Sequence, residues 1–524
     1  MSKQLQSLSV AAPGFFGLNT QDSPVGMSAN FAKIADNCVI DKQGRIAARQ
    51  GYTQVSTSTG GLGSNPIEAL HEHVAYDGTK TVYSAGNNLL YTGTTTLATL
   101  TFPVGYQTVT ANNWKIISFN NNVYFFQRGY TPLKQTNGTG DLAELAHGNN
   151  DAPQTNEVIA AFGRLWTSDN TTDKYTVHFS GLLDDDFHVT QSGGSNAGVL
   201  DLTKVWASDE IVALAEFNGS LVILGKRQTV LYKGADSIDT ISLIDIINVG
   251  CIARDSVQAT ADDLIFLSDQ GVMSLGRLIQ EKSQPLRDIS KNVRSDLMGD
   301  VPSDTTGVKS VYSPENAFYL LSLPAVSKVY VFDLRGALED GAYRATKWTS
   351  IALTAFERLS DGTLYMGKDT LGIVQYGSFQ DAGNSYRMKY FSNEQDFGAP
   401  ANEKFLKKMR ITVIGGSLST AVLKWSYDYE DSYSQETFTF GSDVIGQFGI
   451  SEFGSQDTTP VSGGSPPDYN FQIAEYNSGV TINRPSVNAS GSGTTLSFGV
   501  EAIINNSNFS IQKIDILALI GRLL

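Results

Sequence analysis

The chain alternates short apolar segments with turns rich in glycine, asparagine and aspartate. In the clearest case, the apolar segments 82–85 and 89–91 flank the turn Gly86-Asn87-Asn88. Successive side chains of a strand point to opposite faces, and Gly, Asn and Asp favour tight turns, so this pattern predicts β-hairpins. The same pattern predicts further hairpins at 123–126, 164–166, 220–232, 264–275, 318–332 and 363–376.

The hairpins begin roughly 40 to 57 residues apart, close to the ~40–50 residues of one β-propeller blade. A single hairpin leaves a hydrophobic face and an unpaired edge exposed, whereas blades stacked around an axis bury those faces. We therefore expect residues 61–380 to form a β-propeller with six or seven blades. A β-sandwich or a β-solenoid is the alternative, because no blade signature repeats letter for letter.

The pattern changes beyond residue 380, where the expected strands are longer and the blade spacing stops. Residues 441–468 are rich in Gly, Ser, Asp and Pro and predict a long surface loop, and 495–523 returns to alternating apolar residues. The sequence therefore predicts a mainly β chain with three parts. These are an extended N-terminal segment (1–60), the propeller (61–380) and a β-sandwich-like C-terminal domain (381–524).

One segment departs from the strand pattern. Leu286, Ile289, Val293 and Leu297 recur at the spacing of one helix face. We expect a helix here that ends at Gly299 and packs on the propeller.

The composition suits many strands joined by turns. Gly supplies 50 of the 524 residues, and only 17% of residues are charged, which fits a chain that buries much of its surface against copies of itself. The formal net charge of −15 repels phosphate and argues against sequence-specific binding of nucleic acid. Two cysteines, Cys38 and Cys251, exclude a disulfide scaffold, and no apolar run approaches the ~20 residues of a membrane span.

Residues that usually carry catalysis or bind metals are sparse. No nucleophile motif accompanies the histidines, and no phosphate-binding or dinucleotide-binding glycine motif occurs. His71 and His73 share one face of an expected strand, but a third metal ligand is missing from the local sequence. The acidic runs 184–186 and 428–431 are expected to be solvated turns, with glycosidase chemistry or calcium binding as open alternatives. We therefore expect no catalytic residue, no cofactor and no metal.

The sharpest resemblance to a known family lies near the N-terminus. The segments are FGLNTQDSP at 16–24, ADNCVI at 35–40 and GRIAARQGY at 44–52. A looser echo runs through 163–166, 178–180 and 211–224. These segments resemble the tail nozzle, or tail tubular, proteins of short-tailed bacteriophages, and the likeness is specific only in these patches.

This resemblance implies a structural virion protein rather than an enzyme. A family member would form a homohexamer below the portal-adaptor protein, with a propeller and a β-rich platform or nozzle domain. It would conduct DNA during ejection, contact tail fibres, spikes or a needle, and be assembled in the bacterial host cytoplasm into the phage tail. Arg45 and Arg49 would pair with acids of a neighbour or lie exposed. The alternatives are a phage receptor-binding or glycan-degrading β-propeller and a cellular propeller scaffold.

The loop expected at 441–468 contains apolar residues that a purely flexible linker does not need. Our hypothesis is that six such loops narrow the mouth of a channel or hold a plugging partner, and a disordered surface loop is the alternative. The candidate gate residues are Val444, Ile445, Phe448, Ile450 and Phe453.

Overall fold

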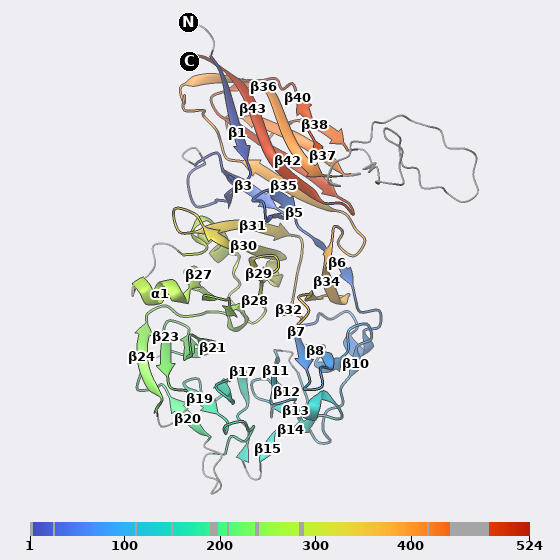
Figure 1. Cartoon of the computed structure of the whole chain (residues 1–524), viewed down its shortest axis with the longest axis vertical. Coiled ribbons are helices and arrows are strands. Elements are labelled where there is room, and N and C mark those ends of the chain that lie inside the picture. The colour runs from blue at the N-terminus through green and yellow to red at the C-terminus, as the bar shows by residue number, and fades with distance from the viewer. Residues whose placement is uncertain are drawn as a thin grey trace, which may run out of the picture. The chain divides into compact units, whose positions relative to one another are not determined.

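The computed structural model describes residues 4–24, 27–110, 113–147, 150–188, 197–206, 209–235, 240–281, 288–416, 419–440 and 482–523. The chain divides into two compact units. Residues 52–377 form one, here called the propeller unit, and residues 1–51 with 378–524 form the other, here called the two-sheet unit. Strands dominate both units (Figure 1).

The propeller unit is a closed ring of antiparallel sheets, as the hairpin spacing predicted (Figure 1). Six separate three- or four-stranded sheets serve as blades, and β28–β31 fill one further sector of the ring. The innermost strands lie next to one another in chain order, and the last lies beside the first. They are β7 (Ala69–Val74), β11 (Lys115–Phe119), β17 (Thr155–Ala161), β21 (Ile211–Phe217), β25 (Gln258–Ala259), β28 (Lys309–Ser313) and β32 (Ala355–Arg358). A β-sandwich and a β-solenoid are thereby excluded for this unit.

The remaining strands extend each blade outward from the axis. The second strands are β8 (Lys80–Gly86), β12 (Asn122–Phe126), β18 (Arg164–Asn170), β22 (Ser220–Gly225), β26 (Leu264–Ser268), β29 (Phe318–Leu323) and β33 (Leu364–Lys368). The third strands are β9 (Leu89–Thr92), β13 (Leu133–Gln135), β19 (Thr176–Phe179), β23 (Thr229–Lys233), β27 (Gly271–Ser274), β30 (Lys328–Ala337) and β34 (Gly372–Ser378). The outer strands are β10 (Ala98–Thr99), β14 (Ala143–Glu144), β20 (Gly198–Asp201), β24 (Ser242–Ile247) and β31 (Tyr343–Thr349).

Several of the turns that marked the sequence share one backbone geometry. Asn87 and Asn88, between β8 and β9, have φ of 49° and 60°, and Asn218 and Gly219, between β21 and β22, have 49° and 69°. Two consecutive positive φ angles define the type I′ turn, whose twist matches that of the flanking strands. Asparagine and glycine tolerate this conformation best, so local chemistry specifies the hairpins.

The ring is closed by a strand from the start of the unit. The last blade, β32–β33–β34, is completed by β6 (Gly51–Gln54), and the backbone N–H of Val55 donates to the carbonyl of Ile373 at 2.9 Å. The first and last strands of the propeller unit thus share one sheet. Opening the ring would expose the faces of two blades at once.

Apolar side chains fill the spaces between consecutive blades. Between the third and fourth blades, for example, Trp166, Phe179, Leu221 and Tyr232 belong to one buried cluster, and the rings of Trp166 and Phe179 are 4.9 Å apart. Similar clusters lie between the first and second, the second and third, and the fourth and fifth blades, and between the last blade and the first. The first four blades therefore contribute both faces to the core, which is why their strands read as almost continuous apolar runs.

The two-sheet unit combines strands from both ends of the chain (Figure 1). One sheet has β36 and β43 at its centre, with β1 and β5 along the other side of β43. Its strands are β1 (Gln4–Ala11), β4 (Cys38–Ile40), β5 (Ile46–Ala48), β36 (Asn402–Gly415), β39 (Ile482–Asn483), β40 (Ser486–Val487), β41 (Ser492–Gly493) and β43 (Phe509–Leu523). The other sheet has the order β2–β3–β35–β42–β37–β38. These strands are β2 (Gly17–Leu18), β3 (Phe31–Asp36), β35 (Tyr386–Ser392), β42 (Leu496–Ile504), β37 (Thr420–Tyr427) and β38 (Ser434–Thr439).

The N-terminal residues are not a separate extended segment, contrary to our expectation for 1–60. β1 pairs along its whole length with β43, from Gln4 opposite Ile520 to Ala11 opposite Lys513. The backbone N–H and C=O groups of an extended segment need hydrogen-bond partners, and β43 provides them for β1. The propeller unit accordingly runs from 52 to 377 rather than from 61 to 380.

The helix expected from 286 to 297 begins later than its pattern indicated. Residues 291–293 form a 3-10 helix, and the α-helix α2 (Arg294–Asp300) follows and includes Gly299. Val293 and Leu297 are buried, as expected for the apolar face. A second short helix, α1 (Leu275–Glu281), directly follows β27. None of the helices in the described ranges is long and apolar enough to cross a membrane.

Candidate functional site

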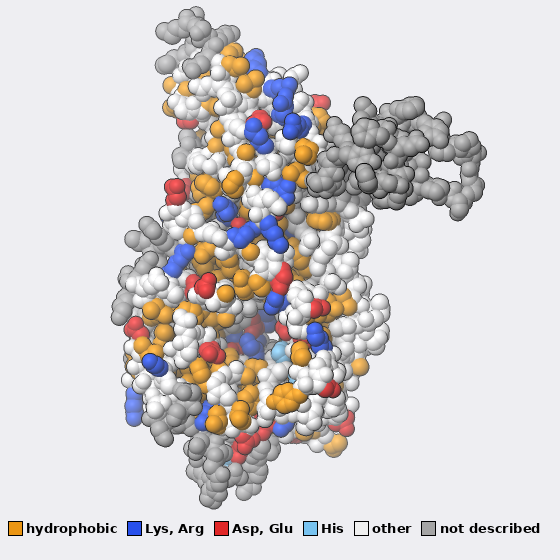
Figure 2. All heavy atoms as spheres, viewed as in Figure 1, with side chains coloured by type: hydrophobic (Ala, Val, Ile, Leu, Met, Phe, Trp, Pro, Cys, Tyr) orange, Lys and Arg blue, Asp and Glu red, His pale blue; other side chains and the backbone are white. Residues whose placement is uncertain are grey.

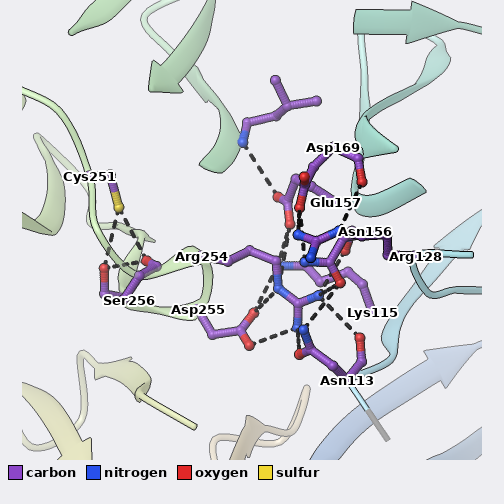
Figure 3. Close-up of polar contacts among 12 residues, drawn as sticks. Asn113, Lys115, Arg128, Asn156, Glu157, Asp169, Cys251, Arg254, Asp255 and Ser256 are labelled. Carbon is purple, nitrogen blue, oxygen red and sulfur yellow. Dashed lines mark hydrogen bonds and ion pairs between the residues drawn. The ribbon is translucent and has the colours of Figure 1, made fainter. Parts of the chain in front are cut away.

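Charged side chains from several blades meet on the axis of the propeller (Figure 3). They lie at or near the starts of the innermost strands β11, β17 and β28, and in the 3-10 helix η4 (Arg254–Ser256) that precedes β25. Because the innermost strands line the axis, residues far apart in the sequence come within ion-pair distance there. We refer to these residues as the axial cluster, which consists of Lys115, Glu157, Arg254, Asp255 and Lys309.

Arg254 connects the members of this cluster. Its Nη1 donates to the carbonyl oxygen and the side-chain oxygen of Asn156, at 2.7 and 3.0 Å, and its Nη2 donates to Asn113 Oδ1 at 2.9 Å. Nε and Nη2 also form a two-pronged pair with the carboxylate of Asp255, at 2.9 and 2.8 Å. A guanidinium carries five donors in one plane, so one side chain can tie η4 to two other blades.

Asp255 is surrounded by cations. Lys309 Nζ lies 2.6 Å from Asp255 Oδ2, and Lys115 Nζ lies 3.6 Å from Asp255 Oδ1. Burial by itself would raise the pKa of this carboxyl, but Arg254, Lys309 and Lys115 outweigh it and hold the pKa of Asp255 well below its usual range. Asp255 is therefore ionised at neutral pH, with cations in place of the water that burial removed.

Glu157 is held more loosely. Its Oε2 lies 3.6 Å from Lys115 Nζ and 3.8 Å from Arg254 Nε, which is within ion-pair range but beyond a hydrogen bond. Its Oε1 accepts a hydrogen bond from the backbone N–H of Leu214 at 3.5 Å. Burial raises the pKa of Glu157, and the two cations offset that effect only in part.

A second network continues from the axial cluster through Asn156. Asn156 Nδ2 donates to Asp169 Oδ2 at 3.2 Å, and Lys174 Nζ donates to Asp169 Oδ1 at 2.5 Å. Arg128 also pairs with this carboxylate (Figure 3). Acidic and basic side chains therefore alternate through the two networks, so that each of the charges named here has an opposite charge beside it.

The axial cluster borders three cavities of the propeller unit. A cavity of about 300 Å³ is lined by residues at the starts of innermost strands, including Asn113 and Asn156. A cavity of about 430 Å³ reaches the far end of β21 at Phe217, and a third of about 320 Å³ lies beside β7 and β32. Arg254, Asp255 or both line each of these cavities. The ion pair of these two residues therefore lies between the cavity at the strand starts and the cavity that reaches Phe217. Figure 2 shows a hollow on the visible side of the propeller unit, with basic and histidine side chains inside it.

The third cavity contains groups whose pKa values are displaced by burial. Burial raises the pKa of Glu357 to about 7, and burial, with His73 and Lys115, lowers the pKa of His71 to about 4. Burial also raises the pKa of Glu68. His71 Nδ1 lies 3.6 Å from Glu357 Oε1. At neutral pH His71 is therefore uncharged and Glu357 is partly protonated.

The two histidines considered as metal ligands lie on one face of β7, as the alternation predicted. His71 Nε2 and His73 Nδ1 are each 2.8 Å from the hydroxyl oxygen of Ser118 on β11. They thus link the first two blades. Within the described residues, no three His, Cys, Asp or Glu side chains gather closely enough to hold a metal ion.

The acidic run 184–186 is not a solvated turn, contrary to our expectation. Asp185 and Asp186 are buried. Asp185 Oδ2 accepts a hydrogen bond from the hydroxyl of Tyr124 at 2.8 Å and lies 2.5 Å from Lys134 Nζ. The run packs against β12 and β13, which supply an aromatic hydroxyl and a cation in place of water.

The second acidic run, 428–431, stabilises the turn in which it lies. Asp428 is exposed, and its Oδ1 accepts hydrogen bonds from the backbone N–H groups of Thr494 and Thr495, at 2.7 and 3.1 Å. These bonds lower the pKa of Asp428 although its burial acts in the opposite direction. Asp428 therefore fixes the turn after β37 to the segment before β42.

The arginines of the N-terminal motif pair within the chain. Arg45 Nε lies 2.6 Å from Asp41 Oδ2, and the buried Arg49 forms a two-pronged pair with Asp381, at 2.8 and 2.6 Å. We expected Arg49 to pair with an acid of a neighbouring copy or to lie exposed. It does neither, because it is buried and pairs with Asp381 of its own unit. The candidate gate residues Val444, Ile445, Phe448, Ile450 and Phe453 lie outside the described residues.

The thiol beside the axial cluster is not activated as a nucleophile. Cys251 is fully buried, and burial raises its thiol pKa to about 12, so it is protonated at neutral pH. Its Sγ donates to the carbonyl of Ala253 at 3.1 Å (Figure 3). The axial cluster can thus join blades and fill the axis, and the adjacent thiol contributes packing.

Sequence reasoning did not find the axial cluster. Lys115, Glu157 and Lys309 are single charges at or near the start of apolar strands, which is also where a solvated strand end would place a charge. A usable signal was the adjacent pair Arg254-Asp255 in the segment that leads to the apolar strand β26, because two opposite charges next to each other in the sequence can neutralise each other when buried.

Comparison with known proteins gives distant structural neighbours and no family. The sequence matches no protein-family profile and no curated protein. Similar solved structures include the WD40 domain of Pan2 from Neurospora crassa, with TM-score 0.39 and 8% identity, over 66% of this chain and 97% of that chain. The WD40 β-propeller domain of Doa1 has TM-score 0.37 and 12% identity, over 62% and 96%. YCF48 bound to D1 peptide has TM-score 0.37 and 8% identity, over 63% and 95%.

Proposed function

We propose that this chain is a structural virion protein, the distal tail tube or nozzle of a short-tailed bacteriophage. It would form a homohexamer that conducts DNA during ejection, below a portal-adaptor protein, and hold other tail parts such as fibres, spikes or a needle. The proposal rests on the N-terminal segments at 16–24, 35–40 and 44–52, which resemble that family.

The structure supports this proposal through the use it makes of those segments. They form β2 to β6, which lie among strands from the C-terminal part of the chain. Arg49 Nε donates to Asn37 Oδ1 at 3.2 Å, and Asn37 Nδ2 donates to the carbonyl of Arg387 at 2.9 Å. The motif residues thus serve the architecture of the two-sheet unit, as expected of a structural protein whose motif specifies its shape.

The charged residues on the axis of the propeller restrict where a DNA conduit can lie. A duplex cannot pass through cavities of about 300 to 430 Å³ that are separated by the ion pairs of Arg254 and Asp255. In this proposal the DNA passage is therefore enclosed between copies of the chain, and the propeller of each copy forms part of its wall. Six copies carry a formal charge of 6 × −15 = −90, which repels DNA and keeps it from adhering.

The deciding experiment locates and counts the chain in virions. Particles that contain it are purified, a tag at its C-terminus is labelled, and a three-dimensional map of the tail is determined by electron cryomicroscopy. We expect six copies in a ring at the distal end of the tail. A map with another copy number, or a chain absent from the tail, contradicts the proposal.

The same particles separate the proposal from a glycan-degrading propeller. The purified chain is incubated with capsular and lipopolysaccharide glycans of the host, and new reducing ends are measured. We expect none. Turnover would favour the enzyme and would direct attention to the buried carboxylates Glu357 and Glu157.

A further inference from the structure

Within the part of the two-sheet unit that the structure describes, two long strands pair on one side only. They are β1 and β38, the longest edge strands among the described residues of this unit. An edge strand presents a row of N–H and C=O groups without partners, and is therefore a template for another strand. Proteins usually block such edges with charges, proline, bulges or short strands.

β1 has none of these protections. Its sequence, QLQSLSVA, contains no charged residue and no proline, and it pairs with β43 over eight residues without a register shift. The propeller unit treats its outer strands differently. β10 and β14 span two residues each, and β24 carries Asp245 and a bulge opposite Leu231.

An apolar row reaches the open edge of β1. Leu5 lies opposite Leu519 on β43, and Leu519 lies opposite Phe405 on β36. Residues directly opposite each other share one face of a sheet, so the three side chains form a row across the strands. The row ends at Leu5, which is 56% exposed. A strand added beside β1 would continue the row and cover Leu5.

β38 needs a partner for a different reason. It pairs with β37 from Ser434 opposite Trp425 to Thr439 opposite Thr420, again without a shift. Five of its six residues are exposed, all but the half-buried Phe438, so both of its faces are largely in water. Its single charge is Glu436, and β1 carries none, so no like charges would oppose each other between the two edges.

We propose that the edge of β1 in one copy of the chain pairs with the edge of β38 in a second copy. Two different edges that meet head to tail form a heterologous contact, which generates a ring when the rotation closes. This inference builds on the proposed ring of copies, and it names the backbone contact that would join neighbours by strand addition. β1 against β1 of another copy is the competing arrangement, and it would stop at a dimer.

Engineered disulfides test the pairing directly. Cys38 and Cys251 are fully buried, so cross-links between copies report introduced cysteines. Ser7→Cys is combined in turn with a cysteine at each position from 434 to 439 in the full-length chain, and the concentrated proteins are oxidised. We expect at least one combination to give a ladder of multimers on a non-reducing gel, with Ser7→Cys alone giving monomer.

Several outcomes would overturn the inference. Dimers from Ser7→Cys alone would show that β1 pairs with itself. Monomer from every combination would show that these edges do not meet. A sixfold ring in virions without any cross-link would contradict this contact but agree with the proposed function. A cross-linked ladder from a chain that is absent from virions would support this contact and contradict the proposed function.

A pair of proline variants provides the matched control. Consecutive residues of a strand point their N–H groups to opposite sides, so one of Gln6→Pro and Ser7→Pro removes a bond to β43 and the other removes a free donor. We expect the variant with the unchanged melting temperature to lose association in analytical ultracentrifugation. Association by that variant at the level of the original chain contradicts the proposed pairing.

Discussion

The two units of this protein treat their interior charges and their edges in opposite ways. The propeller unit places Arg254, Asp255 and their partners on its axis and closes its ring with β6. The two-sheet unit pairs the buried Arg49 with the partly exposed Asp381 and also buries Glu394 and Lys404, and among its described residues β1 and β38 pair along one side only. One unit closes its ring of sheets, whereas the other leaves two edge strands with one pairing each among the described residues.

This difference separates the residues that stabilise the fold from the strand edges that are open to association. A ring of blades leaves only short or bulged outer edges, so its remaining weak point is the axis, where strand starts converge. Ion pairs fill that point in this chain. A pair of sheets has edges by construction, and in the proposed assembly a neighbouring copy pairs with those edges. Mutations on the axis should therefore change folding, and mutations at the edges should change association.

The largest effect is expected from Arg254→Met. The change leaves Asp255 and Glu157 buried with one cation fewer, and it removes the donor to Asn113 Oδ1 and to the carbonyl oxygen of Asn156. Removing one partner of a buried ion pair costs about 3–5 kcal/mol, so the free energy of unfolding should fall by that amount. Urea unfolding followed by tryptophan fluorescence measures it.

The fluorescence signal can be assigned to one unit. Four of the five tryptophans belong to the propeller unit, and Trp425 alone lies in the two-sheet unit. Trp425→Phe in both proteins therefore isolates the propeller transition. An unchanged midpoint in the Arg254→Met variant would show that the axial cluster does not stabilise the ring.

A smaller effect is expected from Arg49→Met in the two-sheet unit. Arg49 pairs with Asp381 and lies over the ring of Tyr386, 4.1 Å from its centroid. Asp381 is partly exposed and can regain water, so we expect a loss of about 2–3 kcal/mol rather than the full cost of a stranded buried charge. Hydrogen exchange should accelerate in peptides from β35 and β42 and stay unchanged in the propeller unit. Acceleration in both units would mean that they unfold together.

The next effect concerns pH and the cavity beside β7 and β32. The folded pKa of Glu357 is about 7 because of burial, above its usual 4.5, so its stabilising contribution is present below about 4.5 and is lost as pH rises through about 7. His71 acts in the opposite direction, because its pKa of about 4 lies below 6.5 and its contribution is lost as pH falls. The two trends offset each other between pH 4.5 and 6.5.

Glu357→Gln separates the two trends. The variant keeps only the His71 contribution, so its free energy of unfolding relative to the original chain should increase by about 1–2 kcal/mol from pH 4.5 to 7.5, after a discount for partial solvent access. Urea unfolding at several pH values measures this difference. A constant difference across that range would show that Glu357 titrates normally in the folded protein.

The smallest effect is expected from Lys226→Ala. Lys226 Nζ lies 2.7 Å from Glu210 Oε2, but the two side chains are 57% and 44% exposed. Water already solvates both charges, so the loss should be about 0–1 kcal/mol. This variant is the exposed counterpart of Arg254→Met in the same unit. A loss as large as that of Arg254→Met would mean that burial is not what gives the axial cluster its strength.

Local features of the chain predicted the blades. The turn at Asn87-Asn88 and the apolar segments on either side are specified by residues within ten positions of one another. Such hairpins form from short-range preferences, so their number and spacing indicated a propeller. The place of residues 1–51 was not predicted, because the partners of β1 and β3 lie more than 350 positions away in β43 and β35.

The sequence by itself determined the strand alternation, the turn chemistry and therefore the repeated blade, since each depends on neighbouring residues. Only the tertiary structure decided that Lys115, Glu157, Arg254 and Lys309 would meet on one axis. A charge at the start of a strand carries no information about which other charges will surround it. Ring closure brings these residues together, and the low dielectric around the axis then strengthens the attraction between their opposite charges.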